Sequence, residues 1–136
     1  MNRTACVGVA AFLLLAGCQN QPDQLRVPSA PADGQLLSYR DTVAKARTLA
    51  TSAVEAFYVD NWTDVEAAAT NLEKTAQFLP KAIDVPAARQ STLDAQSQAL
   101  QQDAQKLRES AHQADVKKTN EVLQRIHLQV RELKPD

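Results

Sequence analysis

The chain of 136 residues contains only three glycines, and none of them follows Gly34. Glycine-rich phosphate loops and the dinucleotide-binding fingerprint need glycines at fixed spacings, so residues 35–136 can carry neither. Hairpin turns of the Asn-Gly type are missing for the same reason. The common nucleotide-binding sites are therefore excluded, and Ala, Gln, Leu, Glu and Lys, which are good helix formers, dominate instead.

Cysteine is nearly as scarce, since Cys6 and Cys18 are the only two and both lie near the amino terminus. If residues 1–17 are removed and Cys18 is modified, the remaining domain has no free thiol. It would then have no disulfide, no thiolate metal site and no cysteine nucleophile. Its stability would have to come from packing.

The only long apolar run covers Thr4 to Ala16 and follows a basic residue, Arg3. A positively charged start followed by such a run is typical of a secretory signal. The run is shorter than the roughly 20 apolar residues that span a bilayer. No second apolar run follows, so the sequence predicts no transmembrane helix.

The stretch Leu15-Ala16-Gly17-Cys18 closes this run and resembles the lipobox of bacterial lipoproteins at every position. The resemblance implies that the signal is cut before Cys18, whose thiol receives a diacylglycerol and whose new amino group is usually acylated. Two or three chains would anchor the protein firmly, because one chain gives only marginal binding. Gln19, in place of an Asp, favours the outer membrane, with the domain facing the periplasm. The alternative is a buried helix with an incidental cysteine.

Residues 19–34 contain three prolines and one glycine in a polar context, which is typical of an extended linker. We therefore divide the chain into a lipoprotein signal peptide at 1–17, a lipidated cysteine with a flexible linker at 18–34, and a folded domain at 35–136.

Within that domain the apolar residues recur at helical spacing and predict four helices, near 35–59, 63–79, 85–113 and 115–134. Thr63 with Glu66 is a capping box for the second helix, Asp84 and Pro86 are start signals for the third, and Asp115 is an N-cap for the fourth. The expected core-facing positions are Leu36, Tyr39, Val43, Ala46, Ala50, Ala53, Phe57, Val65, Ala68, Leu72, Ala76, Leu79, Leu93, Leu100, Ala104, Leu107, Ala111, Val116, Thr119, Leu123, Ile126, Val130 and Leu133.

Short connections place neighbouring helices antiparallel, so the predicted fold is all-α, an up-down-up-down four-helix bundle. A pair of long helical hairpins that dimerise is the alternative, and the sequence leaves the oligomeric state open. Removal of Arg3 with the signal leaves 14 basic and 16 acidic residues, and Lys117-Lys118 is the only adjacent basic pair. This distribution gives no basic face for nucleic acid.

Histidine is limited to His112 and His127. Glu109, His112 and Asp115 are spaced three apart, and carboxylates with an imidazole can hold Zn or Cu, so these three form a candidate metal site. The alternative is a solvated helix end at which Asp115 caps the next helix. His127 is expected to be a half-buried residue at the edge of the apolar stripe. Since no catalytic motif is recognisable around either histidine, we expect no enzyme activity and no catalytic residue.

Aromatic residues are few, and Phe57, Tyr58 and Trp62 gather around the first predicted turn. Phe57 and Trp62 should meet at one end of the bundle, on the side of His112. One interpretation is that the aromatic rings close the end of the core. The other is that Tyr58 and Trp62 form a partner-binding patch.

The helical region also resembles the periplasmic four-helix cytochromes of the cytochrome c′ and cytochrome b562 group. The resemblance rests on size and arrangement, with helices reading 62-WTDVEAAATNLEKTAQFLPK-81 and 116-VKKTNEVLQRIHLQVREL-133. It implies a shared scaffold. The Cys-x-x-Cys-His motif is missing and the only methionine is Met1, so both haem-binding patterns are absent and no cofactor is expected.

Together these features predict a membrane-anchored, noncatalytic lipoprotein that acts by contact with a protein partner in the cell envelope. The alternative is a helical bundle that binds a ligand or metal, either in its interior or through Glu109, His112 and Asp115. A haem protein with His127 as sole axial ligand is a further hypothesis.

Overall fold

The computed structural model describes residues 27–134. The signal peptide, Cys18 and residues 19–26 lie outside them. The described part is all-α and contains no strand, as predicted. None of its helices is both long and apolar enough to cross a membrane. Its elements are α1 (Tyr39–Tyr58), α2 (Trp62–Phe78), the 3-10 turn η1 (Leu79–Lys81), α3 (Ala87–His112) and α4 (Val116–Glu132).

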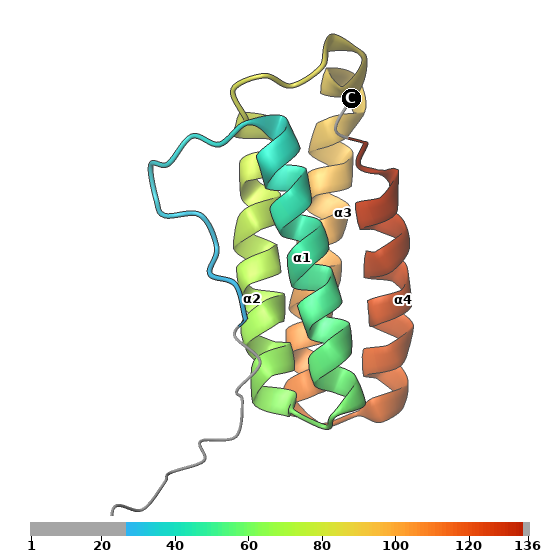
Figure 1. Cartoon of the computed structure of the whole chain (residues 1–136). Helices are drawn as coiled ribbons and strands as arrows, with labels where there is room; N and C mark the ends of the chain where they lie inside the picture. The colour runs from blue at the N-terminus through green and yellow to red at the C-terminus, as the bar shows by residue number, and fades with distance from the viewer. Residues whose placement is uncertain (1–26, 135–136) are drawn as a thin grey trace, which may run out of the picture.

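The four helices lie side by side, and α1 contacts α2 and α4 but not α3 (Figure 1). The turns α1–α2 and α3–α4 lie at one end, which we call the aromatic end because it holds Phe57, Tyr58 and Trp62. The connection from α2 to α3 lies at the opposite end. α3 likewise contacts α2 and α4, so α1 and α3 are diagonal to each other.

The predicted apolar stripes form one buried core with few exceptions. Every core-facing position predicted for the second and third helices is buried. Ala68, Ala69 and Ala76 have no exposed surface on α2, which lets α1 and α3 approach it closely. Leu36 and Val116 were wrongly assigned to the core, being 65% and 58% exposed, because one precedes α1 and the other is the first residue of α4. Phe57 is only partly buried against the core.

The starts of the helices follow the predicted signals only in part. Asp115 caps α4 as predicted, and its side chain accepts a hydrogen bond from the backbone N–H of Lys118. The capping box at Thr63 was wrong, because α2 begins one residue earlier and Asn61 is its N-cap, accepting from the N–H of Asp64.

Asp84 was also assigned wrongly as a start signal for the third helix. The N-cap of α3 is Pro86, which makes no side-chain cap. The carboxylate of Asp84 instead accepts a hydrogen bond from the backbone N–H of Tyr39 at the start of α1. Ser38 is the N-cap of the same helix, and its side-chain oxygen accepts a hydrogen bond from the backbone N–H of Asp41.

Two helices end in the same left-handed turn without a glycine. Asp60 has φ of 54° after α1, and Ala114 has φ of 49° after α3. At each end the next residue donates its N–H to a carbonyl five positions back, namely Asn61 to Ala56 and Asp115 to Ser110. This is a Schellman ending, in which glycine is the usual residue at the left-handed position.

The predicted linker does not stand free along its whole length. Pro31 is buried, Val27 packs against the core, and the carbonyl of Pro28 accepts a hydrogen bond from the side chain of Asn71 on α2. Residues 27–37, which we call the strap, therefore run along the bundle towards the start of α1 (Figure 1). This hydrogen bond and the packing of Val27 hold the segment on the bundle. Composition alone did not reveal it, because it depends on a donor that lies on another part of the chain.

Candidate functional site

A groove that is open to solvent lies between α1 and α4, in the half of the bundle nearest the aromatic end. Its volume is about 430 Å³. α1 contributes Val54, Phe57 and Tyr58, and α4 contributes Asn120, Leu123, Gln124, His127 and Leu128. We call it the α1/α4 groove. Apolar side chains form most of its lining, so it can accept apolar groups of a partner.

The apolar lining of the groove combines residues from the core-facing and the solvent-facing sides of the two helices. Leu123 is 4% exposed and belongs to the core, whereas Leu128 is 57% exposed on the outer side of the same helix. Across the groove Tyr58 is 78% exposed, while Phe57 packs partly against the core. Side-chain exposure thus increases from the floor of the groove to its rim.

The two aromatic residues predicted to form a partner-binding patch are in different surroundings. Phe57 packs against both of them, with ring centroids 5.8 Å from Trp62 and 6.0 Å from Tyr58. Trp62 is partly buried and packs against the core, so it helps to close the aromatic end. Tyr58 instead lines the groove. Trp62 does not.

Sequence reasoning missed Val54 and Leu128 as surface candidates. Both lie off the regular apolar stripes of their helices, and for that reason the core pattern did not include them. An apolar residue on the otherwise polar face of a helix was the available signal. Leu128 follows His127 and lies on the outward side of a stripe made by Leu123, Ile126 and Val130.

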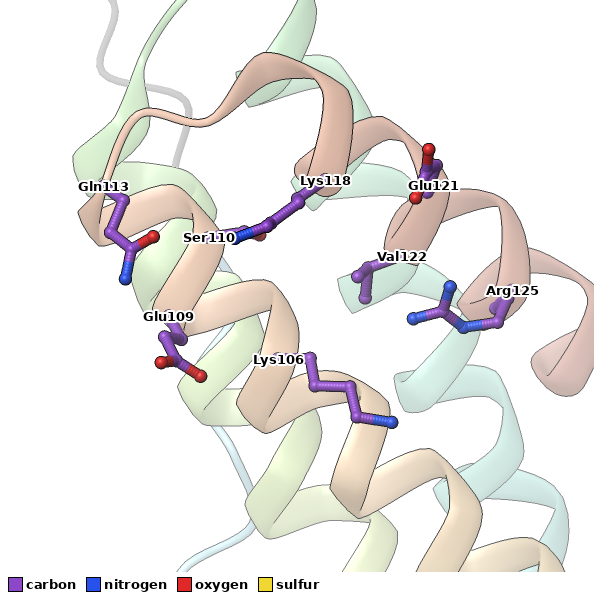
Figure 2. A pocket seen from close by; sticks show the side chains of 8 residues that line it. All are labelled: Lys106, Glu109, Ser110, Gln113, Lys118, Glu121, Val122 and Arg125. Atoms are coloured by element: carbon purple, nitrogen blue, oxygen red, sulfur yellow. The ribbon is translucent and has the colours of Figure 1, made fainter.

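A second pocket, of about 230 Å³, lies between α3 and α4 near the aromatic end and is lined mostly by charged residues (Figure 2). Glu109 and Lys106 enter it from α3, and Lys118, Glu121 and Arg125 enter it from α4. Because carboxylates and cations alternate around the opening, neither sign of charge dominates. This pocket therefore offers no clear preference for an anion or a cation.

The predicted metal site is not assembled by the fold. No group of three or more His, Cys, Asp or Glu side chains within residues 27–134 is placed to hold a metal ion. Asp115 caps α4, and Glu109 lines the charged pocket. His112 is 80% exposed in its side chain, and its Nδ1 lies 3.5 Å from a carboxylate oxygen of Glu66 on α2. The metal hypothesis thus gains no support from the geometry and stays a prediction.

His127 is exposed, although the sequence predicted a half-buried residue. It lies one turn from Leu123 and one turn from Arg131, on the solvent-exposed side of α4, whose core side still buries Ile126 and Val130. Its ring lines the α1/α4 groove together with Gln124. The groove thus contains a polar group that can donate or accept a hydrogen bond.

One buried carboxylate joins α3 to α4 beside the charged pocket. Asp103 is 5% exposed and accepts hydrogen bonds from the guanidinium of Arg125 at 3.2–3.4 Å and from the amide of Gln129 at 2.8 Å. Lys106 lies 3.5 Å away on the same helix. Since these donors occupy both oxygens, Asp103 acts as a link between the helices.

A third pocket, of about 350 Å³, lies between α3 and α4 near the end of α4. Gln96 and Gln129 both line it, and the amide oxygen of each is buried without a hydrogen-bond partner. The remaining lining is apolar except for Glu132 and consists of Ala95, Ala99, Leu100, Glu132 and Leu133. A buried acceptor without a donor is costly, so this pocket has the chemistry to receive a hydrogen-bond donor.

Comparison with known proteins adds no relative, since no protein-family model, no curated protein and no solved structure matches the chain.

Proposed function

We propose that the protein is a lipid-anchored lipoprotein of the cell envelope whose up-down-up-down bundle binds a protein partner and catalyses no reaction. The bundle would face the periplasm, anchored through Cys18 in the outer membrane. The positions of the connecting turns at alternate ends of the bundle support this topology.

The observation that carries the interaction role is the α1/α4 groove. Tyr58 and Leu128, which are 78% and 57% exposed, present large apolar side chains on either side of one groove. Exposed apolar surface of this kind, rimmed by polar groups, marks interaction sites in proteins.

The lipid anchor is supported by the match of Leu15-Ala16-Gly17-Cys18 to the lipobox. We expect Cys18→Ser to prevent incorporation of labelled fatty acid and to release the protein from washed membranes. The matched control is Cys6→Ser, which changes the other cysteine and should leave both properties intact. Normal anchoring of the Cys18 variant would show that the protein is held to the envelope in some other way.

The interaction role is tested by crosslinking in intact cells. The full chain should form the same discrete heterologous adduct in independent cultures, and Leu128→Asp should reduce its yield. Leu128 is exposed, so its substitution should leave the circular dichroism spectrum and the melting temperature nearly unchanged. The interaction role would be contradicted if the full chain formed no heterologous adduct, or if Leu128→Asp did not change the yield of the adduct.

A bundle that binds a small ligand is the second candidate, and the pocket of Gln96 and Gln129 favours it. Their two unpartnered amide oxygens would bind a ligand that donates hydrogen bonds and carries an apolar part. Native mass spectrometry of protein purified from its own membranes tests this candidate. A reproducible bound mass that Gln96→Leu abolishes would favour it, and a ligand-free protein would count against it.

A further inference from the structure

We propose that the pocket of Gln96 and Gln129 binds an organic primary ammonium ion that carries an apolar group. This inference rests on the second candidate function, because it names the class of ligand for that pocket, and it is separate from the interaction role of the α1/α4 groove. It follows from the unpartnered oxygens of the pocket, from its one charged lining residue and from a comparison between the two halves of the bundle.

The amide of Gln129 has an orientation that Asp103 fixes. Its nitrogen donates a hydrogen bond to a carboxylate oxygen of Asp103 at 2.8 Å, and an ionised carboxylate can only accept. The nitrogen therefore faces Asp103, and the amide oxygen is left buried without a partner. A buried acceptor of this kind costs free energy until a donor reaches it.

Gln96 supplies a second oxygen in the same condition from the other helix. It lies on α3, whereas Gln129 lies on α4, and its amide oxygen is also buried without a hydrogen-bond partner. Both side chains line one pocket. Since the terminal torsion of a glutamine is soft, small rotations can turn both oxygens towards one donor group between the helices.

Glu132 is the one charged residue in the lining. Within residues 27–134 its carboxylate makes no ion pair. Arg125 is paired with Asp103 at 3.2 Å, and Arg89 donates to the backbone carbonyl of Glu132 at 3.4 Å, but neither arginine lines the pocket. The lining therefore offers one negative charge and two neutral acceptors, and it contains no cation.

The two helical hairpins of the bundle are equivalent, which gives this pocket a comparison within the same molecule. α1 ends at Tyr58 and α2 covers Trp62–Phe78. At a constant offset of 54 positions, α3 ends at His112 and α4 covers Val116–Glu132. Each position of the α3/α4 hairpin therefore has a counterpart in the α1/α2 hairpin.

At the counterpart positions the polar side chains are short and satisfied. Thr42 and Thr75 stand where the other hairpin has its two glutamines, and both are fully buried. Each hydroxyl donates to the backbone carbonyl four residues back, at 2.9 Å and 2.8 Å. Phe78 stands where the other hairpin has Glu132. The unpartnered acceptors and the carboxylate are therefore a property of the α3/α4 hairpin and not of the packing that both hairpins share.

A primary ammonium matches these groups in number and in charge. It has three N–H donors and no acceptor, so it can donate to both amide oxygens and to the carboxylate of Glu132. Hydrogen bonds assisted by charge are the strong ones. A hydroxyl brings a single donor, and a carboxylate or phosphate group would bring a charge of the same sign as Glu132.

The rest of the lining selects an apolar group on the ammonium. It consists of Ala95, Ala99, Leu100 and Leu133, which offer no hydrogen bond from their side chains. The pocket volume of about 350 Å³ lies at the lower end of the range for small-molecule sites. The ligand is therefore an amine with a short alkyl or aryl group.

The test is isothermal titration calorimetry of the full, lipidated chain in phosphatidylcholine nanodiscs, with empty nanodiscs as the blank. The probe is n-butylammonium. Two analogues keep its alkyl chain, since n-butanol lacks the charge and n-butyltrimethylammonium keeps the charge but has no N–H donor. We expect one saturable site for n-butylammonium and binding at least about tenfold weaker for both analogues.

Two variants place the probe in this pocket. Gln96→Leu should weaken binding of n-butylammonium about tenfold, and Glu132→Gln about threefold, because solvent screens the exposed Glu132. Gln98→Leu and Glu121→Gln make the same changes at exposed positions of the same two helices, outside the pocket, and should leave the dissociation constant unchanged. The analogue series on the parent needs no variant, so it decides the matter even if Gln96→Leu fails to fold.

Nanodiscs that contain phosphatidylethanolamine distinguish a free amine from a lipid headgroup. In this lipid a phosphate lies two carbons from the ammonium, where the pocket is apolar. We therefore expect no competition with n-butylammonium. Competition would overturn the assignment of an apolar group beside the ammonium.

The inference is overturned if n-butylammonium shows no saturable binding, if either analogue binds as tightly, or if neither Gln96→Leu nor Glu132→Gln weakens its binding. A natural bound mass that depends on Gln96, together with failure of n-butylammonium, would overturn the ammonium and leave the ligand-binding function standing. Failure of both would overturn both. The interaction role is tested at Leu128, outside this pocket, and does not depend on these outcomes.

Discussion

The carboxylate of Asp84 accepts a hydrogen bond from the backbone N–H of Tyr39 at 2.6 Å, although 45 positions separate the two residues. Nearby, the N–H of Ile83 donates to the carbonyl of Leu37 at 3.2 Å. The connection between α2 and α3 thereby caps the start of α1. One of the N–H groups that a helix start leaves unpaired is satisfied by another part of the chain, and the negative charge lies at the positive end of the helix dipole.

Asp84→Ala should lower the free energy of unfolding by about 1 kcal/mol, which is the usual cost of losing a cap. Asp84→Asn keeps an acceptor oxygen but loses the charge, so its loss should be smaller. Urea denaturation followed by circular dichroism measures both. Equal stability of the alanine variant and the parent would show that this hydrogen bond does not contribute to folding.

Ala114→Gly should stabilise the protein by about 0.5–1 kcal/mol. Ala114 has φ of 49°, a left-handed conformation that costs a residue with a Cβ about 1–2 kcal/mol. Glycine adopts it without that cost. The matched control is Ala44→Gly in the interior of α1, which should destabilise by about 1 kcal/mol. Thermal unfolding of the two variants should therefore shift in opposite directions, and two shifts of the same sign would contradict the prediction.

Arg125→Ala should destabilise the bundle by about 1–2 kcal/mol. It leaves Asp103, which is 5% exposed, with Gln129 and the more distant Lys106 as its remaining donors. The partial exposure of Arg125 keeps the loss below that of a fully buried pair.

The double variant Asp103→Asn with Arg125→Ala should recover part of that loss, because a neutral amide costs less to bury than a carboxylate. Lys118→Ala is the control, since it removes an ion pair with Asp115 that is much more exposed. Additive losses in the double-mutant cycle would indicate that Asp103 and Arg125 are not coupled.

Asn71→Ala should loosen the strap without unfolding the bundle. The variant removes the donor to the carbonyl of Pro28, so backbone amides in residues 27–37 should exchange with deuterium about five to ten times faster. Amides in the interior of α1, such as that of Val43, should keep their rates. Gln77→Ala, at an exposed position of the same helix, is the control. Unchanged exchange in the strap would mean that other contacts hold it.

The helices could be predicted from the sequence because a 3.6-residue period repeats over many turns, and positions such as Leu72, Leu100 and Ile126 are buried as that period requires. The ends were predicted less well. Leu36 continued the seven-residue spacing of the first helix although Ser38 starts that helix two residues later, and Asn61 competed with Thr63 as the N-cap of α2.

Features made by contacts between distant residues could not be read from local patterns. The hydrogen bond from the N–H of Tyr39 to Asp84 and the packing of the strap on Asn71 each depend on which helices become neighbours. The α1/α4 groove depends on the same information, because Tyr58 and Leu128 meet only when α1 lies beside α4. Tyr58 was predicted as a surface candidate because aromatic residues gather around the first turn, and its partner across the groove was not predicted.

The strap also sets the order in which the domain would respond to mechanical load. A pull on the chain from before Val27 first meets the packing of Val27 against the core and the hydrogen bond between Pro28 and Asn71 on α2. Only after residues 27–37 peel away does the force act on Tyr39 and the start of α1. Release of the strap would therefore add eleven residues of extended chain before the first helix while the four helices remain folded.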